Sequence, residues 1–193
     1  ILGNDKEVAE WERAAAKRKR TMDKLMWNKS RGLYYDYNYY KEQRGNVASL
    51  AAYYPMWAGM VDETKARALV RALRRFEQKG GLSTTDSTPL GVLVPGTMPM
   101  QWAYPNGWAP LHFIVVKGLQ RYGYHDEARR IAMRWLHTNL QWFKHHGVFL
   151  EKYNVVNPEK PPIKGVYPSQ TGFGWTNAVF ERFCQEFIDR QEG

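Results

Sequence analysis

Residues 109–135 read APLHFIVVKGLQRYGYHDEARRIAMRW, and no other stretch indicates the architecture as clearly. Apolar side chains recur three or four residues apart from Leu111 to Tyr122, and again from Ala128 to Trp135. This spacing places them on one face of a helix, so the stretch predicts two amphipathic helices. Asp126 is expected to open the second helix.

Other segments repeat this helical pattern. Further apolar stripes run from Val8 to Met26, Val47 to Ala58, Ala66 to Phe76 and Phe180 to Phe187. Asp62 is a suitable N-cap for the helix over 66–76, and Gly80-Gly81 is expected to end it. Six helices in three antiparallel pairs form a bundle, a solenoid or a toroid. The sequence shows no repeat of fixed period, which argues against a solenoid.

Two long segments, 80–107 and 147–172, lack a helical stripe and are predicted to be loops. Loops of this length inside a compact domain are usually functional. A third segment, from Leu33 to Tyr40, alternates aromatic residues in a way that suits an extended loop or a short strand. If the long loops gather at one end of the helices, they form a cleft there, and we expect the chemistry in that cleft.

The charge balance first suggests nucleic acid as a partner. The chain of 193 residues has 28 basic and 19 acidic residues, a net charge of +9. However, the basic run Lys17–Arg20 lies in a helical pattern that also carries acidic residues, and no nucleic-acid-binding motif accompanies it. A solvated helix face is the favoured interpretation. No apolar run approaches the roughly 18 residues of a membrane span, so neither nucleic acid nor a membrane is an expected partner.

The sequence contains no recognisable motif for binding a metal ion or a cofactor. His112, His137, His145 and His146 do not form a recognisable ligand set, and no glycine-rich phosphate loop is present. Cys184 is the single cysteine and is expected to be a small core residue. We therefore expect no metal and no cofactor. The chain starts at Ile1 without an initiator methionine, which suggests a processed product or a fragment.

Aromatic residues gather in the loops, within a chain that has 8 Trp and 12 Tyr. The segments are QWAYPNGWAP at 101–110, FLEKYNV at 149–155 and GVYPSQTGFGWTNAV at 165–179. Aromatic faces of this kind stack on sugars. Glu151 lies between Leu150 and Tyr153, so we expect it to be partly buried. Two interpretations stay open from its neighbours alone: a proton-transfer group, or a structural ion pair with Lys152 or an arginine.

These segments resemble the trehalases, glycoside hydrolase family 37. QWAYPNGWAP is similar to a family signature Q-W-D-x-P-x-G-W-x-P, and FLEKYNV to a segment E-K-Y-D. GVYPSQTGFGWTNAV is similar to E-Y-P-x-Q-x-G-F-G-W-T-N-G-V, and the earlier LMWNKSRGLYYDYNYY to L-W-x-x-x-x-G-x-Y-x-D-Y. The matches follow the family order over nearly all of residues 1–193.

The resemblance implies an all-α fold, an (α/α)6 toroid, and inverting hydrolysis of the disaccharide α,α-trehalose to glucose. It implies that Glu151 is the general base and that Gln101, Trp102, Trp108, Phe173 and Trp175 shape the substrate pocket. The family's general acid lies in a G-W-D motif upstream of the second signature, and this sequence has no such motif.

Residues 1–193 therefore resemble the C-terminal half of one catalytic domain, with about three of the six hairpins. A half toroid exposes an apolar seam, so an N-terminal half is expected as another chain or another part of the polypeptide.

Two positions depart from the family pattern. Ala103 replaces the aspartate of the signature, and Val166 stands where the family has a glutamate. Loss of two carboxylates removes acceptors for sugar hydroxyls, each worth about 1.5–3 kcal/mol. Three interpretations follow: a trehalose hydrolase, a hydrolase of another α-glucoside, or a non-catalytic sugar-binding or scaffold relative. The intact Glu151 favours a working hydrolase.

Overall fold

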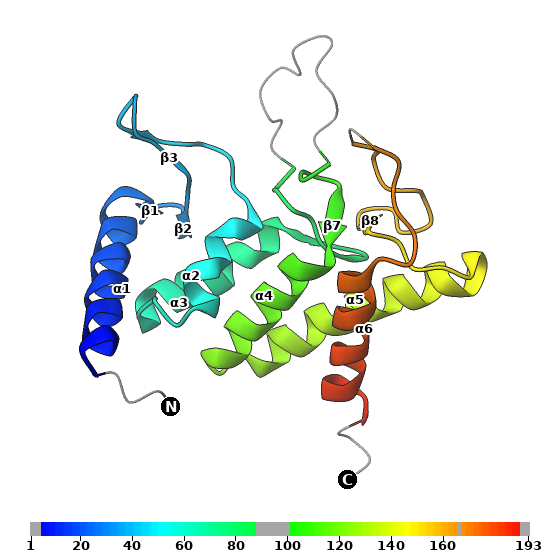
Figure 1. The fold of residues 1–193 in the computed structure, drawn as a ribbon. Helices are drawn as coiled ribbons and strands as arrows, with labels where there is room; N and C mark the ends of the chain where they lie inside the picture. The colour runs from blue at the N-terminus through cyan, green and yellow to red at the C-terminus, as the bar shows by residue number, and fades with distance from the viewer. Residues whose placement is uncertain (1–4, 88–100, 166, 190–193) are drawn as a thin grey trace.

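A computed structural model of the chain describes residues 5–87, 101–165 and 167–189. The departure at Val166 lies outside these residues. The helices of the described part are α1 (Asp5–Leu25), the 3-10 helix η1 (Leu50–Tyr53), α2 (Tyr54–Trp57), α3 (Glu63–Ala72), the 3-10 helix η2 (Leu73–Arg75), α4 (Ala109–Arg121), α5 (His125–His146) and α6 (Gly174–Phe187). Figure 1 shows this mainly helical architecture.

Short antiparallel strand pairs connect the helices. They are β1 (Trp27–Asn28) with β2 (Leu33–Tyr34), β3 (Tyr37–Asn38) with β4 (Gln43–Arg44), β5 (Glu77–Gln78) with β6 (Gly81–Leu82), and β7 (Asn106–Trp108) with β8 (Lys152–Asn154). The first three pairs are local hairpins, and β2 and β3 lie in the predicted aromatic run. The β7–β8 pair joins the two predicted long loops, which are therefore bound to each other.

The two helices predicted over 109–135 are confirmed as α4 and α5, which pack against each other at the centre of the fold. Pro110 lies in the first turn of α4, where a missing N–H leaves no helical hydrogen bond unmade. Gly147 ends α5 in the left-handed conformation, with φ of 70°. Helix α4 packs against α2, α5 and α6, and buries Val115 and Leu119 among them.

Two of the predicted helices are wrong in extent. The stripe over Val47–Ala58 forms only η1 followed by the short α2, which starts at Tyr54 and has Pro55 in its first turn, where the proline ring is tolerated. The third helix does not reach Gly80-Gly81. It starts at the predicted cap Asp62, ends at Ala72 and continues only as η2. Gly80 and Gly81 instead form the turn and start of the β5–β6 hairpin.

The loops that were expected to carry the chemistry lie at one end of the helices. In Figure 1 the β3–β4 hairpin, β7, β8 and the segment leading into α6 are all found above the helices. Helices α4 and α6 both start at this end, directly after β7 and after the 155–173 segment. The gathering of loops predicted from the sequence is therefore present.

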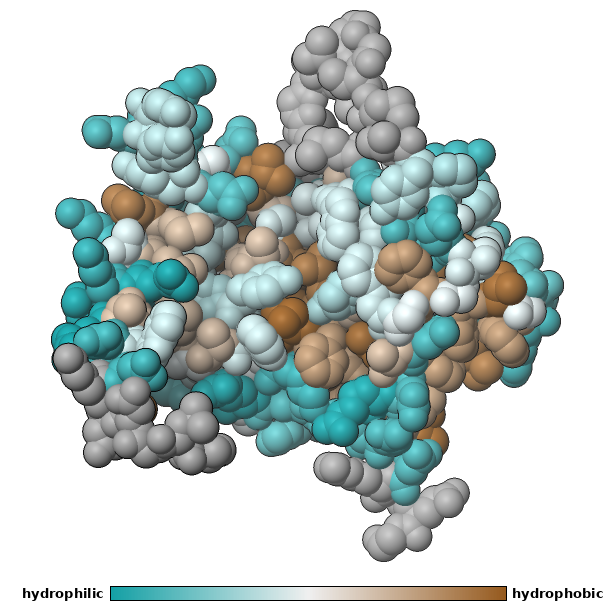
Figure 2. Space-filling model, in the orientation of Figure 1, coloured by the Kyte–Doolittle hydropathy of each residue, from teal (hydrophilic) through white to brown (hydrophobic). Residues whose placement is uncertain are grey.

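Several large apolar side chains remain exposed at the sides of the helices. Trp11 on α1 is 74% exposed, Trp57 on α2 is 41% exposed and Ile188 after α6 is 45% exposed. Figure 2 shows hydrophobic side chains that reach the surface over α4 and beside α6. Surfaces of this kind are usually covered by other protein. Within the described ranges, no helix is both long and apolar enough to cross a membrane.

We expect Gly107 in β7 to tolerate no larger residue. A Cβ atom there would lie 2.5 Å from Val155 Cγ1 and 2.6 Å from the Leu82 carbonyl oxygen. Because a backbone atom cannot move aside cheaply, Gly107→Ala should lower the free energy of unfolding by about 1–3 kcal/mol. Gly174, the first residue of α6, has no atom within 4 Å of its Cβ position. Gly174→Ala is the matched control and should stay within about 0.5 kcal/mol of the wild type.

Thermal or denaturant unfolding of the naturally encoded protein and its two variants measures both values. Equal stability of the two variants would contradict the tight β7–β8 packing described above.

Candidate active site

The pairing of β7 with β8 brings the site together. Trp108 lies opposite Lys152 and Gly107 opposite Tyr153. Glu151 directly precedes β8 at a bend, and its backbone N–H donates to the Gln170 carbonyl at 2.9 Å. The three loop segments predicted to carry chemistry therefore meet at Glu151.

Four of the five predicted substrate-binding residues form one aromatic cluster. The Trp102 and Trp108 rings stack with centroids 3.8 Å apart and planes 1° apart. Trp175 presents its ring at 85° to both, at 6.1 Å from Trp102 and 5.6 Å from Trp108. Phe173 lies 4.7 Å from Trp175. Trp102 is 41% exposed whereas Trp108 is fully buried, so Trp102 presents surface and Trp108 supports it from behind.

Gln101, the fifth predicted residue, acts mainly through its backbone. Its carbonyl accepts the Trp108 indole N–H at 3.0 Å and the Asn106 side-chain amide at 3.1 Å. Asn106 in turn exchanges two hydrogen bonds with the backbone of Ile163, both 3.0 Å. These contacts fix the start of the 101–110 segment against the 155–173 segment, and so hold the indole of Trp108 in one orientation.

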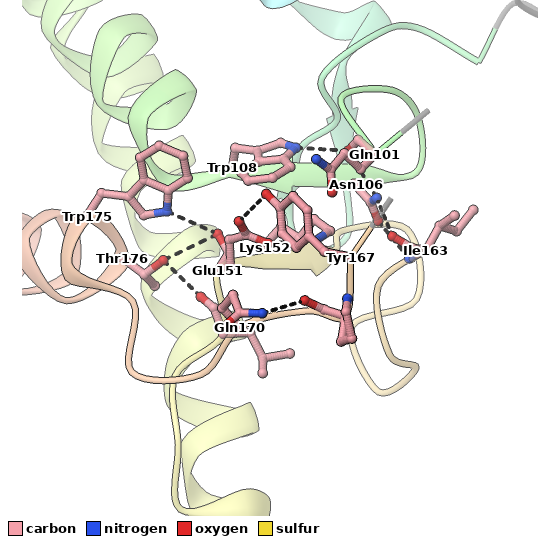
Figure 3. A network of polar contacts seen from close by, with 12 residues as sticks. Gln101, Asn106, Trp108, Glu151, Lys152, Ile163, Tyr167, Gln170, Trp175 and Thr176 are labelled. Atoms are coloured by element: carbon pink, nitrogen blue, oxygen red, sulfur yellow. Dashed lines mark hydrogen bonds and ion pairs between the residues drawn. The ribbon is translucent and has the colours of Figure 1, made fainter. Parts of the chain in front are cut away.

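Glu151 is buried, with 1% of its surface exposed, and both of its carboxylate oxygens have partners. The Lys152 ammonium donates to Oε2 at 2.7 Å, and the Tyr167 hydroxyl donates to Oε1 at 2.7 Å (Figure 3). The hydrogen bond to Glu151 raises the pKa of Tyr167, while the Gln101 side chain lowers it by a contact with the same hydroxyl. The ion pair with Lys152 is present, and it is compatible with either interpretation of Glu151.

The first turn of α6 fixes the backbone of Glu151. The Trp175 indole N–H donates to the Glu151 carbonyl at 3.3 Å, and the Thr176 hydroxyl donates to the Leu150 carbonyl at 2.8 Å. Figure 3 shows these groups converging on the carboxylate segment from one side, with Trp108 and Tyr167 on the others. Trp175 therefore combines an aromatic surface with a backbone contact to the candidate catalytic residue.

His112 on α4 stabilises the site through two hydrogen bonds. Its Nε2 accepts the Leu82 backbone N–H at 2.8 Å, so Nδ1 carries the proton and donates to the Trp108 carbonyl at 2.8 Å. The ring is fully buried and stacks on Trp135 at 3.9 Å. Burial lowers the pKa of His112 to about 4, and the hydrogen bond to Trp108 opposes this shift. A neutral imidazole thus ties β6 to β7.

The sequence interpretation missed the roles of Tyr167 and His112 at this site. Tyr167 is sixteen positions from Glu151, and His112 is thirty from Leu82. A sequence feature that indicates the role of His112 is its position among the apolar residues of the α4 stripe, because a buried histidine needs hydrogen-bond partners. The sequence indicates Lys152 only as an ion-pair partner that would give Glu151 a structural role.

Ala103, where the sequence departs from the family, is 4% exposed. Its carbonyl accepts the Asn106 backbone N–H at 2.9 Å, which closes the turn before β7. The small side chain therefore lies within the packed base of the 101–110 segment.

A separate cavity of about 560 Å³ lies along α5. It is lined by Lys79, Pro158, Glu159 and α5 side chains that include His137, Trp142 and His146. None of the predicted site residues lines this cavity. Among the described residues, no group of three or more His, Cys, Asp or Glu side chains is placed to hold a metal ion.

The helices have their loops gathered at one end, where Glu151 lies among tryptophans. This arrangement is part of an (α/α)6 toroid, and solved structures share the fold. A neutral trehalase from Saccharomyces cerevisiae superposes with a TM-score of 0.79 at 30% identity, over 94% of this chain and 31% of that chain. A mannosylglycerate hydrolase from Thermus thermophilus shares the fold, with a TM-score of 0.63 at 21% identity, over 85% of this chain and 36% of that one.

A sequence model of the trehalase family matches residues 1–187, and the chain belongs to this family. A cytosolic neutral trehalase of Emericella nidulans is 37% identical in an alignment of length 182 that covers 88% of this chain and 24% of the relative. A cytosolic neutral trehalase of Kluyveromyces lactis is 36% identical in an alignment of length 185 that covers 89% of this chain and 24% of the relative. The chain thus spans about a quarter of the length of these curated relatives.

The neutral state of His112 makes stability depend on pH. Between pH 6.5 and about 4, the unfolded chain binds a proton at this position that the folded chain does not. Stability from this group is therefore complete above pH 6.5 and falls as the pH is lowered to about 4. At about 1.4 kcal/mol for each unit of pKa, the loss amounts to about 3 kcal/mol.

Denaturant unfolding of the naturally encoded protein at a series of pH values measures this dependence. His112→Gln should be less stable at pH 7 but should lose less stability between pH 6.5 and 4. Identical slopes for the two proteins would show that His112 is not buried in its neutral form.

Proposed function

We propose that the chain is the C-terminal part of one (α/α)6 catalytic domain, an inverting α-glucosidase that hydrolyses α,α-trehalose to glucose. The observation that carries this proposal is the buried carboxylate of Glu151 against a cluster of tryptophans, on residues that match the trehalase family. The relatives named above are trehalases. The chain contributes about three of the six helical hairpins.

Glu151 is the proposed general base. Its carboxylate has about four lone-pair sites, and Lys152 and Tyr167 occupy two of them. An acceptor site on Oε1 therefore remains for a water molecule. Inversion requires a second carboxyl group roughly 6.5–9.5 Å away to protonate the leaving oxygen. In this proposal that general acid comes from the N-terminal half of the enzyme, in a part of the polypeptide outside residues 1–193 or in a separate chain.

The aromatic cluster is the proposed sugar-binding wall. Trp102, Phe173 and Trp175 are each at least partly exposed, so their faces or edges can contact the apolar side of a glucose ring. Trp108 keeps Trp102 in place by stacking. Gln101 aligns the wall through its carbonyl, which the Trp108 indole contacts. The proposal requires no cofactor and assigns five residues to the substrate pocket: Gln101, Trp102, Trp108, Phe173 and Trp175.

Ala103 favours a second candidate. The family carboxylate is absent at this position, and the alanine is packed rather than open. Either the site binds another α-glucoside, or the protein binds sugar without cleaving it. Val166 is a second departure of this kind. The intact arrangement at Glu151 makes the trehalose hydrolase the first proposal.

Glu151→Gln should abolish hydrolysis in the naturally encoded protein. The amide keeps the shape of the carboxylate but cannot accept the proton from water, so kcat should fall by about 10²–10⁴-fold. Glucose release from trehalose measures the loss. Glu181→Gln is the matched control, because Glu181 is an exposed residue of α6 that contacts only Gln185 among the interactions described. Its activity should equal that of the wild type.

Activity that survives Glu151→Gln would remove Glu151 from the mechanism. Wild-type protein that binds trehalose in a calorimeter without releasing glucose would support the sugar-binding alternative. Cleavage of a different α-glucoside in a substrate panel, with trehalose untouched, would support a change of specificity.

A further inference from the structure

Lys152 is a fully buried lysine, a rare situation for a side chain with a strongly hydrated charge. Its side chain is 0% exposed, and its ammonium lies 2.7 Å from Glu151 Oε2. Consecutive residues of an extended strand point to opposite faces. The bend at Glu151, just before β8, allows these two neighbours to meet. The fold therefore departs from regular strand geometry at the residue whose carboxylate the ammonium contacts.

Two aromatic rings enclose the ammonium. Lys152 Nζ lies 5.0 Å from the centroid of the Trp108 ring and 5.5 Å from that of Tyr167. Both distances are within the range of cation–π attraction. Trp108 is the cross-strand neighbour of Lys152, so the pairing of β7 with β8 sets this contact. The cage restricts where the ammonium can lie.

The restricted ammonium in turn restricts the carboxylate. Lys152 holds Oε2, and Tyr167 donates to Oε1. From α6, the contacts to the Glu151 segment come from the neutral side chains of Trp175 and Thr176. In the described residues, the charged and titratable groups that contact the carboxylate are thus Lys152 and Tyr167. Of these two groups, Lys152 supplies the positive charge that contacts the carboxylate.

We infer that Lys152 is a positioning residue for the reaction: its ammonium holds Oε2 of Glu151 and thereby turns the carboxylate so that Oε1 faces the attacking water. This inference rests on the proposed function, since it concerns the proposed base. The lysine contacts the base rather than the sugar. Its removal should therefore affect proton transfer more than substrate affinity.

Lys152→Met tests this inference in the naturally encoded protein, because methionine fills similar space without charge. We expect kcat to fall about 100-fold and KM to change much less. Lys152→Arg keeps the charge and the ion pair, so its kcat should return toward that of the wild type.

Lys117→Met is the matched control, because it removes an ion pair of similar length, 2.6 Å to Glu186, between α4 and α6 and outside the site. It should leave kcat and KM unchanged. Melting temperatures of all variants separate folding from chemistry. If Lys152→Met folds poorly, the double variant Glu151→Gln/Lys152→Met should melt higher than Lys152→Met alone, since no unpaired buried carboxylate remains.

The outcomes separate the two proposals. Wild-type turnover that Glu151→Gln abolishes, together with an unchanged kcat in Lys152→Met, would overturn the role of Lys152 and leave the proposed function intact. A double variant that melts no higher than Lys152→Met would also overturn it. Turnover that survives Glu151→Gln, or a wild type without turnover, would overturn both.

Discussion

The pairing of β7 with β8 is the constraint on which the rest of the site depends. Each strand has three residues, and all six are buried. Neighbouring segments extend the hydrogen bonding: the Val155 N–H donates to the Pro105 carbonyl at 3.0 Å, and the Thr84 N–H donates to the Asn106 carbonyl at 2.9 Å. Because a buried backbone group without a partner is costly, this small sheet has little freedom to shift its register. The register in turn puts Trp108 beside Lys152, and Glu151 at the edge of the aromatic cluster.

A buried ion pair is a weak source of net stability, because the loss of hydration opposes the attraction between the charges. The pair of Glu151 and Lys152 is better understood through orientation. Contacts from α6 hold the carbonyl of Glu151, and two aromatic rings enclose the ammonium of Lys152. The carboxylate of Glu151 therefore has few alternative positions. Preorganised charge of this kind is what an active site needs, since it does not have to rearrange during the reaction. The same rings that could bind a sugar therefore also arrange the charges beneath it.

The helices explain why this arrangement lies at one end of the molecule. Helix α4 starts directly after β7, and α6 starts after the segment that contains Tyr167. The first turns of both helices therefore lie at the site. Farther along the helices, the ion pair of Lys117 with Glu186 connects α4 to α6, and Arg182 forms a second ion pair with Glu186 within α6. The exposed apolar side chains at the flanks, such as Trp11 and Trp57, are what a partial toroid is expected to present. The share of the relatives that the chain spans, about a quarter, agrees with a partial domain.

The sequence by itself determined the helical class, the helices α4 and α5, the positions of the loops and the trehalase family, because apolar periodicity and local motifs are properties of neighbouring residues. It also singled out Glu151 and four members of the aromatic cluster. It was wrong about the extent of the helix over Val47–Ala58, where α2 starts anew at Tyr54, and about Gly80-Gly81, which form the turn and the start of the β5–β6 hairpin. Only the tertiary structure decided that Lys152 is caged, that Tyr167 contacts Glu151, and that His112 joins Leu82 to Trp108. These contacts depend on the register of strands that are far apart in the chain, and no local pattern specifies that register.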